Sequence, residues 1–485
     1  MKNKLIYTIV IALFAFASCK KDFTERASLS GTTVDNYYNT ADEIRGGTST
    51  LYSGLPWQGF KSRGLDDIGD VMAGNSYTGP GDYGAFLNFS LSSTTPVVSD
   101  SWKAFYKVGG WAGSLIAAFE LKKTLGGDAT LLDAAIAECH FMRGTVYFYI
   151  AKVWGDAPII EDPGAIALSG DYNIPRYIKE DVFQFALNEL KLAEEGLPET
   201  DEPGRVTTYS AKGMMAKLYL YLGQYAEAAA KANEVIQSGQ YDLVSDFQGM
   251  FNSSAYNNNI ETLFAVQHQL AQNPWGTGNQ LQADRGPSNL STDVSNMWEL
   301  FIPTIDARDN IWTDPADLRR AGSMMEHGWS MPQWKPQNAN DDYNAFMANG
   351  YVYDTIQPTD QGGTKNGTRS NIAKYVVGPG AKYGGEEVIG MNTGQNFMIL
   401  RYADVLLIYA EAVLANNAST SDAGALAAIN KVRNRAGLAS LASFTKDEIL
   451  HERRAEFAFE GDYWFDIQRQ GFAKAKQIIE AQNRG

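Results

Sequence analysis

The chain has 485 residues and a formal net charge of −15. This acidic balance disfavours nucleic acids and anionic lipid headgroups as partners, because both select basic surfaces. Only two cysteines are present, so a framework of several disulfides is excluded, and a chain of this length can instead bury a large hydrophobic core. The 25 Tyr, 23 Phe and 10 Trp residues suit the binding of neutral polar ligands by stacking, although most aromatic side chains fill cores.

The N-terminus has the pattern of a secretory signal peptide, which we predict over residues 1–18. Lys2 and Lys4 provide a basic start, and an apolar run follows over residues 5–17. This run is shorter than the about 20 apolar residues that a membrane-spanning helix needs. Export of the chain is therefore expected.

The sequence FASC, which ends at Cys19, resembles a bacterial lipobox. In that motif the cysteine is acylated and becomes the mature N-terminus, and stable anchoring takes more than one acyl chain. We predict lipidation of Cys19 and a polar tether over residues 19–35. The alternative is an ordinary secreted protein with an unmodified cysteine. Cys139, the second cysteine, is predicted to be a small core residue.

The first part of the mature chain mixes helix and loop signals. A short helix is predicted over residues 41–51. Residues 53–100 are rich in Gly, Ser, Thr and Pro and are predicted to be irregular, yet they contain Trp57, Tyr77 and Tyr83. An ordered loop with aromatic side chains is more often functional than a loop without them.

The rest of the N-terminal half, residues 36–245, reads as helical. Apolar residues recur every three or four positions in four further segments, at residues 99–125, 130–158, 175–198 and 207–243. The last segment is similar to a tetratricopeptide unit, in which small residues let two helices approach closely. Ala216, Ala228 and Ala232 are the small residues expected at that contact.

The C-terminal half, residues 246–485, begins with a mixed region. Residues 260–270 alternate in polarity and predict a strand, whereas the segments around Trp275, Trp329 and Trp334 read as loops. A second helix pair is predicted over residues 403–438. The fold class is therefore predicted as mainly α, with tetratricopeptide-like helix pairs that support an irregular, loop-rich, minor-β face. A single domain is expected over residues 36–485.

Three motifs near the C-terminus are specific. They are LRYADVLLIYAEAVL at residues 400–414, INKVRNRAGL at residues 429–438 and ILHERRAEFAFEGDYWFDIQRQG at residues 449–471. Together with the earlier segment HFMRGTVYFYIAKVWGDAPII and the Asp-x-Arg sequence at Asp306 and Arg308, they resemble the SusD/RagB family of outer-membrane nutrient-binding lipoproteins. The similarity runs through nearly the whole mature chain in the same order.

The resemblance implies a function as well as a fold. Members of this family capture nutrients, glycans in most cases and peptides in some, for a SusC-type TonB-dependent transporter. The family implies no catalysis and no cofactor. Location at the outer membrane, through an N-terminal lipid and facing the cell exterior, is implied too.

Four acidic residues in the third motif, Glu448, Glu452, Glu456 and Glu460, fall four positions apart. Like charges at this spacing destabilise an isolated helix. We expect them to pair with nearby arginines, such as Arg433 and Arg435, in a partly buried network that fixes the register of the helices. These motifs are therefore interpreted as scaffold.

No catalytic or metal-binding motif is found in the sequence. The four histidines lie far apart, and HERR at His451 lacks the second histidine of a zinc-protease motif. Paired carboxylates for glycoside hydrolysis can lie far apart in a chain, so sequence alone leaves a surface glycosidase open as an alternative.

The leading hypothesis is non-catalytic binding of an oligosaccharide. Aromatic rings cover the C–H face of a sugar, and each favourable stack contributes on the order of 1 kcal/mol beyond the buried area. The candidate platforms are the aromatic residues of the two loop regions, Trp57, Tyr77, Tyr83, Trp275, Trp329 and Trp334. Trp298 and Trp312 are assigned to packing. A peptide-capturing protein of the same family is the second alternative, for which a deep acidic cleft would be the expected feature.

Overall fold

The computed structural model describes residues 31–79, 84–271, 274–288, 290, 297–335, 350–353 and 369–485. The predicted signal peptide, the predicted lipidation site at Cys19 and most of the predicted tether lie outside these residues. Among the described helices, none combines the length and the apolar composition that a membrane crossing requires. The boundaries of the single domain stay a prediction.

The N-terminal half is helical almost throughout. Its helices are α2 (Ala41–Tyr52), α3 (Gly54–Gly59), the π-helix η2 (Phe60–Val71), α4 (Gly84–Leu87), α5 (Pro96–Thr124), α6 (Ala129–Trp154), α7 (Pro163–Ser169), α8 (Lys179–Gly196), α9 (Thr208–Tyr221) and α10 (Tyr225–Gln237). The helices predicted from periodicity are confirmed, because their apolar stripes and caps are local signals. Asp128, for example, caps α6 by accepting hydrogen bonds from two backbone amides.

The C-terminal half alternates short helices with loops and ends in a helical row. Its helices are α11 (Phe247–Asn252), η3 (Ser254–Tyr256), α12 (Pro274–Thr277), α13 (Leu281–Arg285), α14 (Ile305–Asn310), α15 (Arg319–Ser323), η6 (Ala381–Tyr383), α16 (Tyr402–Leu414), α17 (Ala423–Arg435), α18 (Lys446–Phe457), α19 (Tyr463–Arg469) and α20 (Phe472–Ala481). The predicted second helix pair is α16 with α17.

The described strands form only small antiparallel pairs. They are β1 (Ser76–Thr78) with β5 (Phe301–Pro303), β2 (Ala157–Pro158) with β3 (Arg176–Tyr177), β4 (Thr262–Val266) with β12 (Phe397–Arg401), β6 (Met324–Met325) with β9 (Asn371–Ile372), β7 (Ser330–Met331) with β8 (Tyr351–Val352), β10 (Val388–Ile389) with β11 (Asn392–Thr393), and β13 (Ser419–Thr420) with β14 (Phe444–Thr445). The predicted strand within residues 260–270 is confirmed as β4. The fold class is therefore mainly α with a minor-β part.

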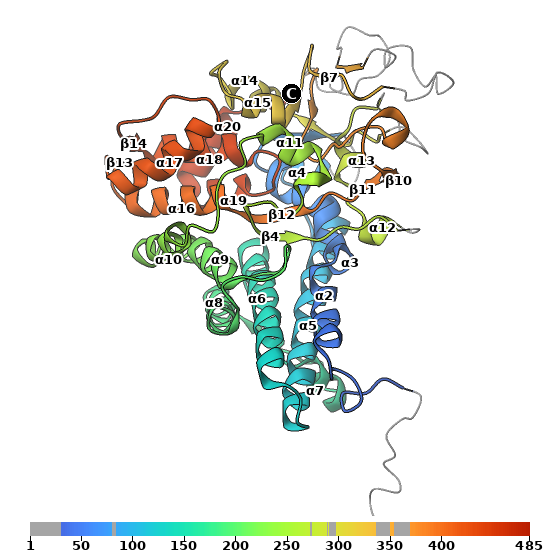
Figure 1. The fold of residues 1–485 in the computed structure, drawn as a ribbon. Coiled ribbons are helices and arrows are strands. Elements are labelled where there is room, and N and C mark those ends of the chain that lie inside the picture. The colour runs from blue at the N-terminus through green and yellow to red at the C-terminus, as the bar shows by residue number, and fades with distance from the viewer. Residues whose placement is uncertain are drawn as a thin grey trace, which may run out of the picture.

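The elements divide into a helical scaffold and a loop-rich face (Figure 1). α5 and α6 form long columns in the lower part of the view, α8 lies beside α6, and α9, α10 and α16 to α18 continue the scaffold across it. α12, α13 and the strand pair β10–β11 lie at the upper right, on the loop-rich face. The first described residues lie beside the opposite end of α5, where Lys122 Nζ donates a hydrogen bond to the Asp35 carbonyl at 3.0 Å.

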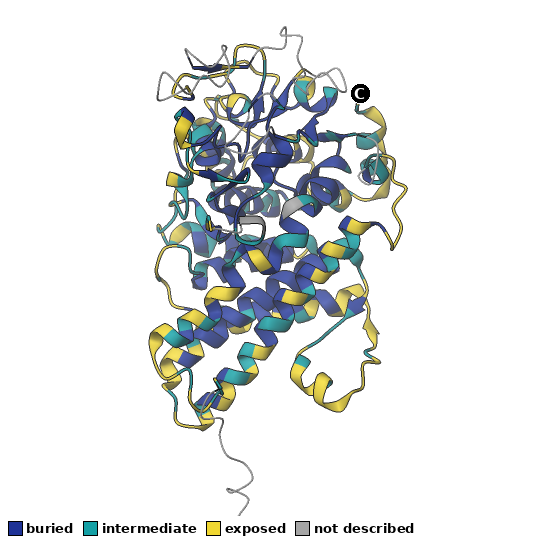
Figure 2. Ribbon diagram, turned by 90° about the vertical axis from the view of Figure 1, so that its right-hand side faces the viewer, coloured by how far each residue is buried: buried dark blue, intermediate teal, exposed yellow. Residues whose placement is uncertain are grey.

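The hydrophobic core runs through the helical columns, and exposed residues gather at their free ends (Figure 2). α6 and α8 approach closely at Gly144, where a Cβ atom would meet Leu190 Cγ at 2.9 Å. Ala216, Ala228 and Ala232 are fully buried between α9 and α10, which confirms the tetratricopeptide-like contact. Cys139 is buried in α6, as predicted.

The prediction of an irregular segment over residues 53–100 is wrong. This segment forms α3, η2, β1, α4 and the start of α5. Its Gly, Ser and Pro residues allow close contacts: a Cβ atom at Gly59 would meet the Asp100 carbonyl oxygen at 2.2 Å. Composition alone therefore could not separate a loop from tightly packed short helices. The π-helical geometry of η2 is rare in proteins and is often found at functional sites.

A buried network of ion pairs confirms the role predicted for the acidic stripe of α18. Arg401 Nη1 contacts carboxylate oxygens of Glu456 at 2.6 Å and Glu261 at 2.7 Å, and Arg401 Nη2 contacts Glu460 at 2.9 Å. Burial raises the pKa of Glu456, but the surrounding arginines outweigh it and hold the pKa well below its ordinary value. Arg433 pairs with Glu452. These pairs tie β4, β12 and α18 together.

Glu448 does not join this network. It forms a capping box with Thr445 at the start of α18, where its carboxylate accepts a hydrogen bond from the Thr445 backbone amide at 2.7 Å. A spacing of four residues along a helix therefore did not give all four carboxylates the same role.

Candidate functional site

One group of aromatic rings on the loop-rich face surrounds Trp334. Its ring centroid lies 5.7 Å from that of Trp329 and 5.8 Å from that of Tyr351. The Trp329 indole Nε1 donates a hydrogen bond to the Ala321 carbonyl at 2.8 Å. Trp329 is half-buried, whereas Trp334 is only 2% exposed. Trp329 therefore offers the accessible ring of this group, and Trp334 supports it.

A second accessible indole belongs to Trp298, which lies in the irregular segment before β5. Its backbone amide donates a hydrogen bond to the Ala283 carbonyl of α13 at 2.7 Å. The guanidinium of Arg63, from η2, lies over the indole with its Cζ atom 5.7 Å from the ring centroid. Trp298 is half-buried, and the Arg63 side chain is 31% exposed. This pair stacks a group with hydrogen-bond donors on one face of an aromatic ring.

The segment around Trp298 joins the two aromatic groups. Met297 packs in the same buried cluster as Trp334 and Tyr351. Glu299 is buried, and its carboxylate accepts a hydrogen bond from Asn371 Nδ2 of β9 at 2.7 Å. Because the residues on both sides of Trp298 are fixed in the interior, its indole is held in place on the loop-rich face.

Two buried carboxyl groups lie close to Arg63. Its Nε atom is 3.7 Å from a carboxyl oxygen of Asp284. Burial raises the pKa of Asp284 to about 8, an effect that Arg63 only partly offsets. Burial also raises the pKa of Asp67 well above its ordinary value, and both carboxyl oxygens of Asp67 lack a hydrogen-bond partner among the described residues. A pKa of about 8 favours the neutral carboxylic acid of Asp284 near pH 7.

Two of the six predicted platform residues are buried, which contradicts a role as open ring faces. Trp57 is fully buried in α3, and its Nε1 donates a hydrogen bond to the Leu51 carbonyl at 2.8 Å. The Trp57 ring packs against Phe105 and Phe264, so no face is left for a sugar. Trp334 is enclosed by its neighbours in the same way.

The other four platform residues stay predictions. Trp329 is the half-buried ring described above, and Tyr77 is half-buried on β1 opposite Ile302 of β5. Tyr83 lies outside the described residues, and so does the side chain of Trp275, whose backbone belongs to α12.

The structure adds Trp298 and Arg63, which the sequence interpretation missed. Trp298 was assigned to packing together with Trp312, and for Trp312 this is confirmed: it is 2% exposed and donates a hydrogen bond to the Ala455 carbonyl. The sequence held no usable signal, because Glu299 has a φ of +53° and side chains of this segment do not alternate as they do in a strand.

No group of three or more metal-ligating side chains is found among the described residues. His268 is buried, which lowers its pKa well below the ordinary value, whereas His451 is exposed on α18. The chemistry that the described residues of the loop-rich face offer is stacking and hydrogen bonding.

Comparisons with known proteins agree with the fold. The sequence profile of the SusD family matches residues 261–484. A SusD-like protein of Bacteroides ovatus is 33% identical over 479 residues, which are 96% of this chain and 82% of the relative. A crystal structure solved with a xylogluco-oligosaccharide has a TM-score of 0.77 at 30% identity, over 91% of this chain and 86% of that chain. A SusD homologue from Bacteroides thetaiotaomicron shares the fold, with a TM-score of 0.72 at 20% identity, over 95% and 90% of the two chains.

The fold and the site define a class of protein in which paired helices carry a loop-rich face with half-buried aromatic rings. The extent of the similarity to the Bacteroides ovatus relative identifies the family. The chain belongs to the SusD family.

Proposed function

We propose that this protein binds a neutral oligosaccharide on its loop-rich face and passes it, uncleaved, to a SusC-type TonB-dependent transporter. The observation that carries the proposal is the half-buried indole of Trp298 beneath the guanidinium of Arg63. Such a pair recognises both parts of a sugar, because the ring covers its C–H face and the guanidinium donates to its hydroxyl groups. The structure with a bound xylogluco-oligosaccharide, at 30% identity, supports this class of ligand.

The remaining parts of the proposal follow from family membership. The protein is held at the outer membrane through the acylated Cys19 and acts there as a binding protein without catalysis. The first described residues lie at the end of α5 that is opposite the loop-rich face (Figure 1). An anchor at that end would leave the loop-rich face free to meet glycans and the transporter.

Calorimetric titration with a xylogluco-oligosaccharide tests the binding step. The chain is used from residue 20 onward, because this form keeps every described residue. We expect the Trp298→Ala and Trp329→Ala variants to lose about tenfold or more in affinity. Stacking of a sugar ring on one indole contributes on the order of 1 kcal/mol in addition to the burial of apolar area. Analysis of the recovered sugar by mass is expected to show no cleavage.

Trp111 provides a matched control on the helical scaffold. It is half-buried on α5, and Lys107 Nζ lies 5.4 Å from the centroid of its ring, so it has the same kind of cation above an indole. The Trp111→Ala variant is expected to bind like the wild type. Equal losses in Trp111→Ala and Trp298→Ala, or hydrolysis of the sugar, would contradict the proposal.

A further inference from the structure

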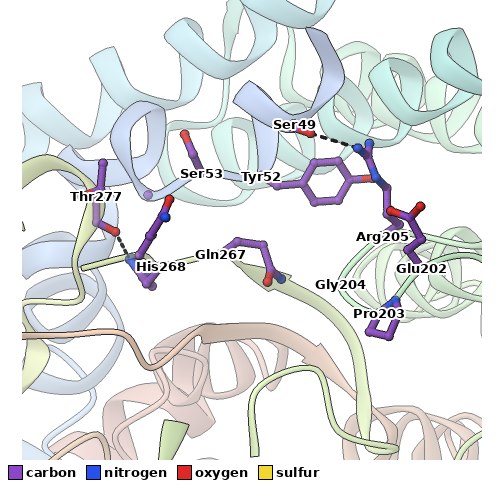
Figure 3. A pocket seen from close by; sticks show the side chains of 12 residues that line it. Ser49, Tyr52, Ser53, Glu202, Pro203, Gly204, Arg205, Gln267, His268 and Thr277 are labelled. Atoms are coloured by element: carbon purple, nitrogen blue, oxygen red, sulfur yellow. Dashed lines mark hydrogen bonds between the residues drawn. The ribbon is translucent and has the colours of Figure 1, made fainter. Parts of the chain in front are cut away.

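A cleft of about 310 Å³ lies at the junction between the helical scaffold and the loop-rich half (Figure 3). Figure 3 shows Thr277 and His268 at one end of this cleft and Arg205 at the other, with Tyr52 and Gln267 between them. The residues come from the end of α2, the α8–α9 loop, the segment after β4 and the end of α12. Neither Trp298 nor Trp329 lines it.

A second cleft, of about 220 Å³, adjoins the first. Both clefts are lined by residues 202–205, so this loop separates two parts of one longer groove. Gly204 lets the loop lie directly on the amide of Asn258: its φ is +94°, and a Cβ atom there would meet Asn258 Nδ2 at 2.7 Å. We call the two clefts together the junction groove.

The walls of the junction groove are rich in amides and hydroxyls. Asn258 and Gln267 exchange two hydrogen bonds of 2.9 Å, and Asn396 Nδ2 donates to Gln267 Oε1 at 2.7 Å. Tyr52 is fixed as well, because its hydroxyl donates to Glu138 at 2.6 Å. A rigid set of neutral polar groups beside an aromatic ring and Pro203 suits a ligand with many hydroxyls.

The charges at the groove are compensated within the protein. Arg205 Nη1 donates to Glu138 at 2.8 Å and to Thr48 Oγ1 at 2.7 Å, and Arg205 Nη2 donates to Ser49 Oγ at 2.9 Å. Glu202 lies 3.6 Å from Arg45. Burial holds the pKa of His268 well below its ordinary value, so this side chain is neutral at pH 7. Apart from Glu202, whose side chain is 70% exposed, these charges are paired within the protein, which favours a neutral ligand over an anionic one.

Three buried polar atoms on the walls find no hydrogen-bond partner among the described residues. They are His268 Nε2 and Thr277 Oγ1 in the first cleft and Thr262 Oγ1 in the second. The His268 ring itself is held, because its Nδ1 lies 3.0 Å from the Thr277 carbonyl and 3.1 Å from Lys61 Nζ. A buried polar atom without a partner is costly, and a ligand hydroxyl can satisfy it directly or through one water.

We propose that the junction groove is a second glycan site, which binds one or two sugar rings of a neutral oligosaccharide separately from the loop-rich face. The volume of the first cleft is at the lower end of the range of about 300–1,000 Å³ for small-molecule sites. The class of ligand, a neutral oligosaccharide, is taken from the proposed function. The new part of the inference is the location of a second binding site and the residues that form it. The ligand would form hydrogen bonds with the side chains of His268, Thr262 and Thr277.

The test follows the threonine methyl groups by NMR during titration with a short xylogluco-oligosaccharide. We expect the methyl signals of Thr262 and Thr277 to shift in the wild type and also in Trp298→Ala, because the groove does not use that indole. Titration with trigalacturonate, which is anionic, is expected to leave them unmoved. The double variant Thr262→Val/Thr277→Val, followed by the methyl signals of the two new valines, is expected to lose about fivefold in groove affinity for each hydrogen bond removed.

Valine replaces threonine without a change of shape, so the double variant keeps the fold. Its melting temperature is expected to be equal to or above that of the wild type, because hydroxyls without partners are removed. Thr145→Val is the matched control, since Thr145 Oγ1 is also buried without a partner but lies in the core of α6. This variant is expected to bind the sugar like the wild type.

The possible outcomes distinguish the proposal of a second site in the junction groove from the proposed binding on the loop-rich face. Sugar binding that depends on Trp298 and leaves both methyl signals unmoved would overturn the groove and keep the proposed function. Unchanged groove affinity in the double variant would also overturn it. If no glycan binds at all, both proposals fail.

Discussion

Trp57 and Trp298 show how differently one residue type is used in this chain. Trp57 is sealed between Phe105 and Phe264, which come from elements distant in the sequence, whereas Trp298 is held at the surface by an inward-facing neighbour. The prediction of an open ring at Trp57 is wrong, because the Gly and Pro residues around it indicate a loop. Only the long-range contacts decide which indole is open.

Replacing Trp57 by alanine therefore tests stability rather than recognition. We expect Trp57→Ala to lose about 3–5 kcal/mol of unfolding free energy, since a fully buried aromatic ring leaves a large cavity. Urea unfolding at 25 °C measures this loss. At temperatures where the variant is folded, its affinity for a xylogluco-oligosaccharide should match that of the wild type. A selective loss of affinity without loss of stability would restore Trp57 as a platform residue.

Asp284 makes the stability of the site depend on pH. Burial raises its pKa from 3.8 to about 8, so the folded protein keeps a proton that the unfolded chain releases above pH 4. The stabilisation from this proton is complete below about pH 4 and is lost as the pH rises towards 8. Asp284→Asn removes this dependence, because an amide does not ionise.

The expected result is a difference between two unfolding curves. Relative to the wild type, Asp284→Asn should gain up to about 1.4 kcal/mol of stability per pH unit between pH 5 and pH 8. Urea unfolding at pH 5, 6.5 and 8 measures it. Asp171, which is exposed, gives the control, because Asp171→Asn should follow the wild type at each pH. Parallel curves for Asp284→Asn and the wild type would show that Asp284 is ionised throughout.

At the scale of elements, the helices that sequence could predict are those whose signals are local. α6 and α9 carry their caps and small residues within their own segments. The π-helix η2 could not be predicted, because it is stabilised from outside by long-range contacts. In η2, Asp66 forms an ion pair of 2.8 Å with Arg285 of α13, and Asp70 accepts hydrogen bonds from two backbone amides that follow α18. The position of Arg63 depends on the geometry of η2. The contact between Arg63 and Trp298 therefore could not be predicted from the sequence.

The ion pairs between β4, β12 and α18 lead to a prediction about these elements. Arg401→Met keeps the volume of the side chain but leaves Glu261, Glu456 and Glu460 buried without their shared cation. Removing one partner of a buried ion pair costs about 3–5 kcal/mol, so a loss of at least this size is expected in urea unfolding at pH 7.

An exposed ion pair gives the control for this experiment. Lys103 and Asp100 lie 3.2 Å apart on α5, with 71% and 57% of their side chains exposed. Lys103→Met should cost less than about 1 kcal/mol, because water screens such pairs. If Arg401→Met were as mild as Lys103→Met, the buried network would contribute nothing to the docking of α18.

For the whole molecule, the proposed anchor and the proposed binding face lie at opposite ends. The chain enters beside the end of α5, where Tyr38 packs edge-on against Phe119, and the accessible indoles lie on the loop-rich face at the other end. A tether attached at the first end needs no contact with the sugar-binding surfaces. This separation leads us to expect that anchoring and glycan binding are independent properties of the chain.

Substitution of the two cysteines tests the anchor. We expect bacteria grown with an alkyne-tagged fatty acid to label the wild-type protein and Cys139→Ser, but not Cys19→Ser. Cys139 is fully buried in α6 and is not available for acylation, which makes it the matched control. Cys19→Ser protein should appear in the soluble fraction and bind the xylogluco-oligosaccharide like the wild type. Labelling of Cys19→Ser, or its loss of affinity in solution, would show that the anchor and the binding surfaces are not organised in this way.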